Sequence, residues 1–215
     1  MFPLAKTLES FSKARLIKFI IFNILIVLAI IGGFTYWSVS YTNSLNIDTG
    51  WIKSILSFLT GTFALIVGWF ILPILMPLIG GIFSEIVIKR VEHVYYPNDE
   101  EDKARFWPDM IHDIKFTLYS LGLNILVIPL YFVGIGFIVS IALNSYLIGI
   151  EFFESAAGYH LGKPMASKLR RKHSSKVFFS GFVLTIMALI PFVNLILPII
   201  AIVWMVHIYH EIKFK

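Results

Sequence analysis

The stretch MALIPFVNLILPII, residues 187–200, decides what kind of fold this chain can adopt. It places two prolines, Pro191 and Pro198, and one asparagine, Asn194, in otherwise apolar sequence. The run around it, residues 177–210, contains no Asp, Glu, Lys or Arg. A straight helix of about 35 residues would reach about 52 Å, well beyond a bilayer core of about 30 Å. The run must therefore tilt strongly, protrude or fold back.

Composition sets the class of protein. Of the 215 residues, 58% are hydrophobic and 14% are charged, whereas about a quarter are charged in soluble domains. Three further runs, residues 19–47, 54–84 and 116–150, also lack Asp, Glu, Lys and Arg. About 20 apolar residues suffice to cross a bilayer. The sequence therefore predicts an all-α integral membrane protein, with a single membrane domain over residues 1–215.

The basic residues indicate which connecting segments share one side of the membrane. Four Lys or Arg lie in residues 1–18, five in residues 85–115 and six in residues 158–176, but only one in residues 38–60. Because basic segments stay cytoplasmic, the chain must cross an even number of times between them, with both termini in the cytoplasm. The net charge of +5 is gathered beside apolar runs, which favours membrane lipids over nucleic acid as a partner.

Two long helices followed by two helical hairpins satisfy this rule. We expect the helices over residues 16–37 and 51–96, and the hairpins over residues 108–157 and 174–212. The centres of the hairpins, IPLYFVGIG and IPFVNLILP, carry no charge, so we expect the tips to penetrate the membrane without emerging. Irregular backbone at that depth needs protein or a wet cavity beside it. The tips are therefore predicted to be buried against other helices or another subunit.

The residues at the bend of the second hairpin are Pro191, Asn194 and Pro198. Proline removes a backbone donor from a helix, and an amide in lipid must find a partner. We interpret Asn194 as a structural residue at this bend, with a role in lining the substrate path as the alternative.

Two acidic residues, Glu151 and Glu154, lie three positions apart at the end of the first hairpin. One interpretation is an interfacial pair balanced by nearby Lys and Arg. The other is a role in permeation or proton relay, since ionisable groups at membrane depth are usually functional. A salt bridge from one of them to a base on the other hairpin would hold the hairpins together.

The C-terminal motif HIYHE contains His207, His210 and Glu211. Histidines three positions apart can contribute metal ligands. However, no second ligand cluster completes the site in the sequence, and His160 and His173 stand isolated. We therefore predict interfacial polar residues here, with no metal and no cofactor.

Catalytic signatures are absent from the sequence. It contains no G-x-S-x-G, no H-E-x-x-H and no phosphate-binding G-K-S/T. The absence of cysteine excludes thiol chemistry. We predict that the protein is not an enzyme. A membrane-embedded enzyme acting on lipid or isoprenoid substrates is an alternative, with Asp109, His112 and Asp113 as its possible start.

Near the N-terminus, Arg15 and Lys18 lie three apart at a predicted helix start, so they share a face. Two cations beside the free N–H groups of a helix start can hold a tetrahedral anion. Alternatively, the two side chains extend to lipid phosphates and anchor the helix.

The C-terminal third carries a family resemblance. The stretch IEFFESAAGYHLGKPMASKLRRK, residues 150–172, precedes ALIPFVNLILPIIAI, residues 188–202. Together they resemble the C-terminal signature of the CysZ-type sulfate permease and etoposide-induced protein family. The resemblance implies two long transmembrane helices with two hemi-penetrating hairpins and assembly into homo-oligomers. For bacterial members it also implies sulfate uptake across the inner membrane.

The same resemblance implies a sulfate site at a Gly-Leu-Arg-type motif with a second base. Its counterpart here is SKARLIKF, in which Arg15 stands near the glycine position, Leu16 fits and Ile17 replaces the first arginine. Lys18 keeps the second base. Either Arg15 and Lys18 form the sulfate site in place of the family's motif, or sulfate is not the substrate. We predict a permease for a small inorganic anion, with sulfate as the leading candidate. A membrane scaffold or assembly factor of the same fold is the alternative.

Overall fold

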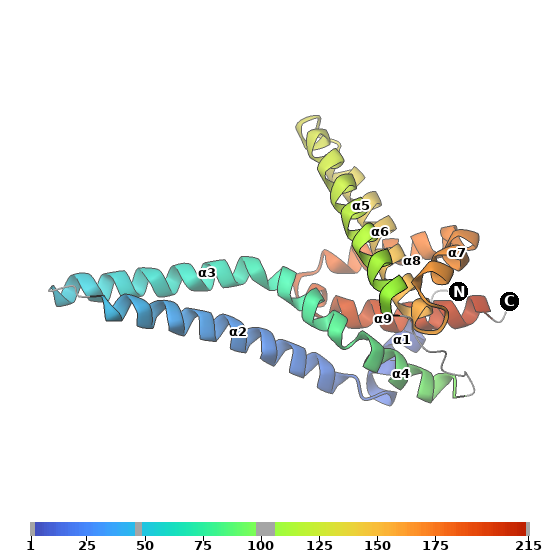
Figure 1. The fold of residues 1–215 in the computed structure, drawn as a ribbon, viewed down its shortest axis with the longest axis horizontal. Helices are drawn as coiled ribbons and strands as arrows, with labels where there is room; N and C mark the ends of the chain where they lie inside the picture. Colours follow the sequence, from blue (N-terminus) through green and yellow to red (C-terminus); the bar gives the residue numbers. More distant parts are fainter. Residues whose placement is uncertain (1–2, 46–48, 98–105, 214–215) are drawn as a thin grey trace. The chain divides into compact units, whose positions relative to one another are not determined.

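The computed structural model describes residues 3–45, 49–97 and 106–213, with the side chains of residues 69–82, 106–108 and 191–192 left out of the description. Throughout these ranges the elements are helices, and no strand occurs in them (Figure 1). Five of the described helices are long and apolar enough to cross a membrane. The chain is therefore an all-α membrane protein, as predicted. The helices are α1 (Leu4–Lys13), α2 (Ile17–Ser44), α3 (Gly50–Ile82), α4 (Ser84–Tyr95), α5 (Phe106–Phe132), α6 (Gly136–Leu161), α7 (Lys163–Lys172), α8 (Ser174–Ala188) and α9 (Pro191–Lys213).

The helices form two compact units. The smaller unit, Ile17–Ile82, consists of α2 and α3, which run antiparallel to each other (Figure 1). Thr42 Oγ1 donates a hydrogen bond to Thr60 Oγ1 over 3.1 Å. A Cβ at Gly68 would lie 2.6 Å from a methyl group of Ile31, so the helices approach closely there. Small residues allow such an approach between membrane helices.

The second predicted helix, over residues 51–96, is divided in the structure. It becomes α3 and α4, with Phe83 between them, and the two parts belong to different units. Gly80 and Gly81 stand just before the break, and glycine is among the poorest helix formers.

The larger unit, Met1–Leu16 with Phe83–Lys215, is built around α9. Helices α1, α4, α6 and α8 all pack against α9. In its most apolar stretch 83% of the residues are buried, compared with 6% in α5. Helix α9 is therefore the core of this unit, while α5 presents apolar side chains outward as a lipid-facing helix does.

Both predicted hairpins are present, α5 with α6 and α8 with α9. The bend of the second one lies at Leu189–Ile190 and corrects the predicted position. Pro191 is the first residue of α9, where proline is well tolerated, and proline disfavours helical backbone in the residue before it. Asn194 and Pro198 lie inside α9. Because Pro198 has no N–H, the carbonyl of Asn194 loses its helical donor.

The tip of the first hairpin is apolar, and the other described helices of the larger unit leave it uncovered. Gly134 turns the backbone with φ +84°, a conformation that glycine adopts readily. Phe132 is 89% exposed and Val133 72%. Within the described part of the larger unit, the predicted burial of this tip against other helices is therefore not observed.

The basic segments of the larger unit gather at the C-terminal half of α9. Ser10 of α1 contacts His207 over 3.0 Å, and Lys176 of α8 forms an ion pair with Glu211 over 2.6 Å. Glu92 of α4 reaches the same half of α9. Both hairpins thus return to the end from which they start, as the charge distribution requires.

Small residues set the contact between α6 and α8. A Cβ at Gly181 would lie 2.0 Å from the carbonyl oxygen of Ser145 and 2.8 Å from the backbone nitrogen of Gly149. These are backbone atoms of a helix, and they cannot move aside cheaply. The hairpins therefore join through glycine rather than through large apolar side chains.

We expect Gly181→Ala to destabilise the protein by about 1–3 kcal/mol through overpacking. Gly122→Ala is the matched control, because a Cβ there meets nothing within 4 Å. Thermal unfolding in detergent, followed by circular dichroism, measures both. Equal melting temperatures for the two variants would contradict the close approach.

The absence of cysteine allows the depth of the first hairpin to be tested directly. In sealed vesicles, we expect Val133→Cys to escape a membrane-impermeant maleimide from either side and to react after solubilisation. Lys168→Cys, exposed on α7, should react from the basic side. Labelling of Val133→Cys from the opposite side would show that the hairpin spans the membrane fully.

Candidate functional site

Of the predicted anion residues near the N-terminus, Arg15 and Leu16 follow the end of α1, and Lys18 is the second residue of α2. Arg15 has φ +53°, a left-handed conformation usually taken by glycine. Its N–H donates to the carbonyl of Ser12 over 3.2 Å, and the N–H of Leu16 donates to the carbonyl of Phe11 over 3.1 Å. This pattern is a Schellman cap. The two amides are therefore engaged in closing α1, and Arg15 has a backbone conformation that glycine usually takes.

The side chains of this segment differ in exposure. Leu16 is fully buried, while Arg15 and Lys18 are exposed. Arg15 belongs to the larger unit and Lys18 to the smaller one. The segment thus supplies exposed cationic side chains.

Glu154 is buried, and each of its two carboxylate oxygens has a polar partner. Its Oε1 accepts a hydrogen bond from Arg170 Nε over 2.7 Å, and its Oε2 lies 2.7 Å from His112 Nε2. Arg170 is in α7 and His112 in α5, so Glu154 ties the first hairpin to the following helix. It does not bridge the two hairpins. Glu151, one turn earlier in α6, is exposed.

An open pocket of about 410 Å³ lies beside Glu154. Basic side chains outnumber the single carboxylate in its lining, and Lys115 and Arg171 are exposed. Arginine and lysine bind anions through charge-assisted hydrogen bonds, so the pocket has the chemistry of an anion site. Its polar lining includes His112, Lys115, Tyr119, Glu154, Arg170 and Arg171.

Asp109, His112 and Asp113, the candidate residues for an enzyme site, all lie near the start of α5 and contact α6 or α7. Asp109 Oδ1 accepts a hydrogen bond from the backbone N–H of Lys163 over 2.8 Å, at the start of α7. Asp113 forms an ion pair with the ammonium group of the same lysine. His112 bonds to Glu154. Each of the three therefore has a partner that fastens α5 to α6 or α7.

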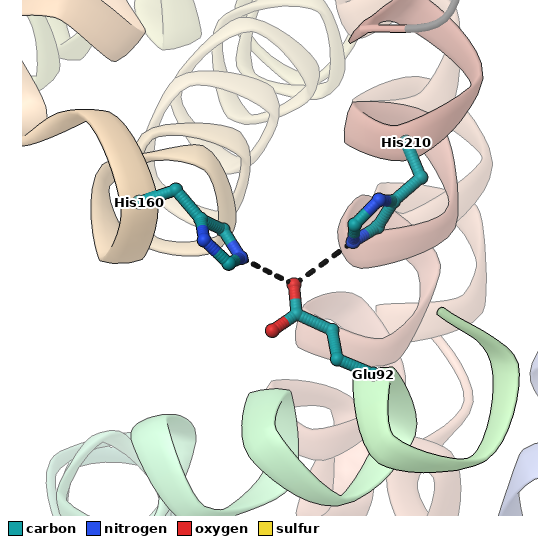
Figure 2. A group of neighbouring side chains, drawn as sticks. All are labelled: Glu92, His160 and His210. Atoms are coloured by element: carbon teal, nitrogen blue, oxygen red, sulfur yellow. Dashed lines mark hydrogen bonds and ion pairs between the residues drawn. The ribbon is translucent and has the colours of Figure 1, made fainter. Parts of the chain in front are cut away.

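A second carboxylate, Glu92, lies where α4, α6 and α9 meet. Its Oε1 is 2.7 Å from His160 Nε2 and 2.9 Å from His210 Nε2, and all three residues are buried (Figure 2). Burial raises the pKa of Glu92, but the hydrogen bonds from the two histidines outweigh it and hold the pKa below its usual value. Glu92 is thus ionised at neutral pH. Both Nε2 atoms donate to it.

Tyr96 links this cluster to a second histidine of α9. Its ring stacks on His210, with centroids 3.7 Å apart and planes at 9°. Burial, followed by the nearby carboxylates, raises the pKa of Tyr96 to about 12, so its hydroxyl stays protonated and donates to His207 Nδ1 over 2.9 Å. Ser10 donates to the carbonyl of Lys6. Its oxygen can therefore accept from His207 Nε2, and α1 joins the network.

Sequence reasoning missed the cluster of Glu92, His160 and His210. The ligand atoms of these residues all lie within 4.8 Å of one another, so the group can hold a metal ion. The HIYHE motif contains one of the three residues, His210. Glu92 lies 118 residues before His210 in the sequence, and His160 lies 50 residues before it. No spacing rule connects positions so distant. The structure thus supplies the partners that the sequence analysis did not find.

We expect Glu92→Gln to destabilise the protein by about 1.5–3 kcal/mol at neutral pH, because hydrogen bonds to a charged group are lost. Because the folded pKa is lowered, the contribution of Glu92 is present above about pH 4.5 and disappears as the pH falls through the folded pKa. Glu85→Gln, at an exposed position of the same helix, is the control. Melting temperatures in detergent across this pH range test it; a difference independent of pH would contradict the assignment.

Comparison with known proteins identifies one family. The sequence model described as sulfate transporter CysZ/etoposide-induced protein 2.4 matches residues 4–198. No curated protein and no solved structure matches the chain. The matched range includes Arg15, the first hairpin and the bend of the second.

Proposed function

The chain belongs to the sulfate transporter CysZ/etoposide-induced protein 2.4 family, and from this premise we propose that it carries a small inorganic anion, sulfate first, across the bacterial inner membrane. The family match is the observation that carries the proposal. Five described helices long enough to cross a membrane support a multi-pass transporter. The chain has no nucleotide-binding motif, so permeation would be passive or coupled to another ion.

The charge distribution supports an anion as the cargo. At the basic end of the larger unit, Arg15 is exposed, and Lys115 and Arg171 line the open pocket. Clustered positive charge raises the local concentration of an anion and speeds its arrival. We assign this end and both termini to the cytoplasm by the positive-inside rule.

The exposed apolar surface supports an oligomer. Phe132, Val133 and Ile138 at the first hairpin tip are each at least 70% exposed, and irregular backbone at membrane depth needs protein or a wet cavity beside it. We propose that copies of the chain cover these tips and that the anion passes between hairpins and subunits. Loss of water from the anion would be offset by backbone N–H groups at helix ends.

Uptake of labelled sulfate into proteoliposomes tests this function. The wild-type chain should show saturable uptake. Arg15→Ala combined with Lys18→Ala should reduce it by about tenfold or more, since each charge-assisted contact contributes about 1.5–3 kcal/mol. Lys13→Ala is the matched control, because Lys13 is exposed nearby but already paired with Glu9 over 2.6 Å. No saturable uptake by the wild type, or none lost in the double variant, would refute the assignment.

The same uptake assay also tests whether the open pocket lies on the anion path. Lys115→Ala combined with Arg171→Ala removes two exposed bases of the open pocket and leaves the Arg170–Glu154 pair intact. If the pocket lies on the path, this double variant loses uptake as well. If only the variant at Arg15 and Lys18 loses uptake, the path bypasses the pocket.

A membrane scaffold or assembly factor is the second candidate. The exposed apolar tip of the first hairpin favours it, because uncovered apolar patches mark sites of association. A scaffold would show no saturable uptake of any small anion. Charge reversal at Arg15 would then leave its assembly unchanged, whereas Phe132→Ser would weaken it.

A further inference from the structure

We propose that Glu92, His160 and His210 bind a divalent transition-metal ion, Zn²⁺ in the first instance, at the meeting point of α4, α6 and α9 (Figure 2). The proposal does not depend on anion transport, because it concerns a different set of residues and a ligand of opposite charge. Three observations support it: the convergence of the ligand atoms, their chemistry and their burial.

The three side chains converge from separate helices. Their ligand atoms lie within 4.8 Å of one another, and the two imidazoles aim their Nε2 atoms at the same carboxylate oxygen (Figure 2). Ligands bound at about 2.0–2.1 Å in a tetrahedron lie about 3.3 Å from one another. The nitrogen-to-oxygen distances of 2.7 and 2.9 Å would therefore lengthen by about half an ångström. Small rotations of the flexible Glu92 side chain can supply that change.

The ligand chemistry selects the metal. Two imidazole nitrogens and one carboxylate oxygen are borderline ligands that suit Zn²⁺ and its neighbours, whereas Ca²⁺ and Mg²⁺ require oxygen ligands in larger number. Two histidines and one glutamate occur as a zinc ligand set that leaves the fourth position open for water. Metal binding also requires a deprotonated carboxylate and a free lone pair on each ligating nitrogen. The ring protons of His160 and His210 would therefore lie on Nδ1 in the metal-bound state, and the metal would replace their two hydrogen bonds to Glu92.

The surroundings of the cluster hold the ligands in place. The ring of Tyr96 covers one face of His210, with centroids 3.7 Å apart, and Tyr209 stacks on His160 at 5.4 Å. His160 is 5% exposed and His210 1%. Side chains fixed in this way lose little freedom when a metal binds, and an apolar shell limits competition from water.

A metal at this position would tie together three helices that are distant in sequence. The larger unit has no disulfide to do so, since the chain lacks cysteine. The buried carboxylate would gain a divalent counter-charge, which favours its burial. An ion that binds the folded chain and not the unfolded chain also stabilises the fold.

The test is the metal content of the full chain. Protein expressed in zinc-supplemented medium is purified in detergent without chelator and analysed by inductively coupled plasma mass spectrometry. We expect about one Zn²⁺ per chain, as a three-ligand site implies, and a fall to trace level in His160→Gln and His210→Gln. His207→Gln is the matched control, a buried histidine of the same helix bonded to Ser10 and Tyr96; it should retain the metal.

Spectroscopy on the wild-type chain keeps the test decisive if the variants fail to fold. After removal of zinc and reloading with Co²⁺, a tetrahedral site gives visible absorption bands, and zinc X-ray absorption reports the ligand shell. Two imidazoles and an oxygen in that shell support the proposal. Trace metal in the wild type, unchanged metal in the cluster variants, or a shell without imidazole would overturn it and leave a hydrogen-bonded cluster only.

Discussion

The larger unit depends on the burial of polar side chains along the C-terminal half of α9. Nearly every residue there is covered by protein, including His207 and His210. A polar group without water needs a partner, because an unmet hydrogen bond costs about 1–3 kcal/mol. The partners are Ser10 in α1, Glu92 in α4 and the hydroxyl of Tyr96 just after α4. The placement of α1 and α4 around α9 follows from this requirement.

The lipid environment explains why the rest of the chain looks so different from α9. Apolar side chains on α2 and α5 lie exposed, as in helices whose solvent is hydrocarbon. Contact between helices then relies on close backbone approach, seen at Gly68 in one unit and at Gly181 in the other. The networks of histidine and charged side chains described above lie in the larger unit, around Glu92 and Glu154.

Charge patterns and apolar run lengths predicted the helical class and the two hairpins, because both follow from crossing a bilayer. The predicted position of the bend in the second hairpin was wrong by a few residues. Proline was assumed to mark the turn, but Pro191 begins a helix and acts on Ile190 before it. The cluster of Glu92, His160 and His210 was out of reach, since hydrophobic periodicity does not say which polar faces of distant helices meet. The sequence identified Arg15 as a candidate anion-binding residue, but its left-handed backbone conformation is seen only in the structure.

The surroundings of the two buried carboxylates, Glu154 and Glu92, favour different ions. The surroundings of Glu154 favour an anion, and those of Glu92 favour a cation. Around Glu154, the bases Arg170 and Arg171 face an open pocket, so the local field attracts anions. In the closed cluster, the side chains of His160 and His210 converge on the carboxylate of Glu92, so the occupant proposed for that position is a cation. An anion path and a metal centre can therefore coexist in one small unit without competing. On these two proposals, the exposed edge formed by α5 and α7 would serve the anion and the centre around α9 would hold the metal ion.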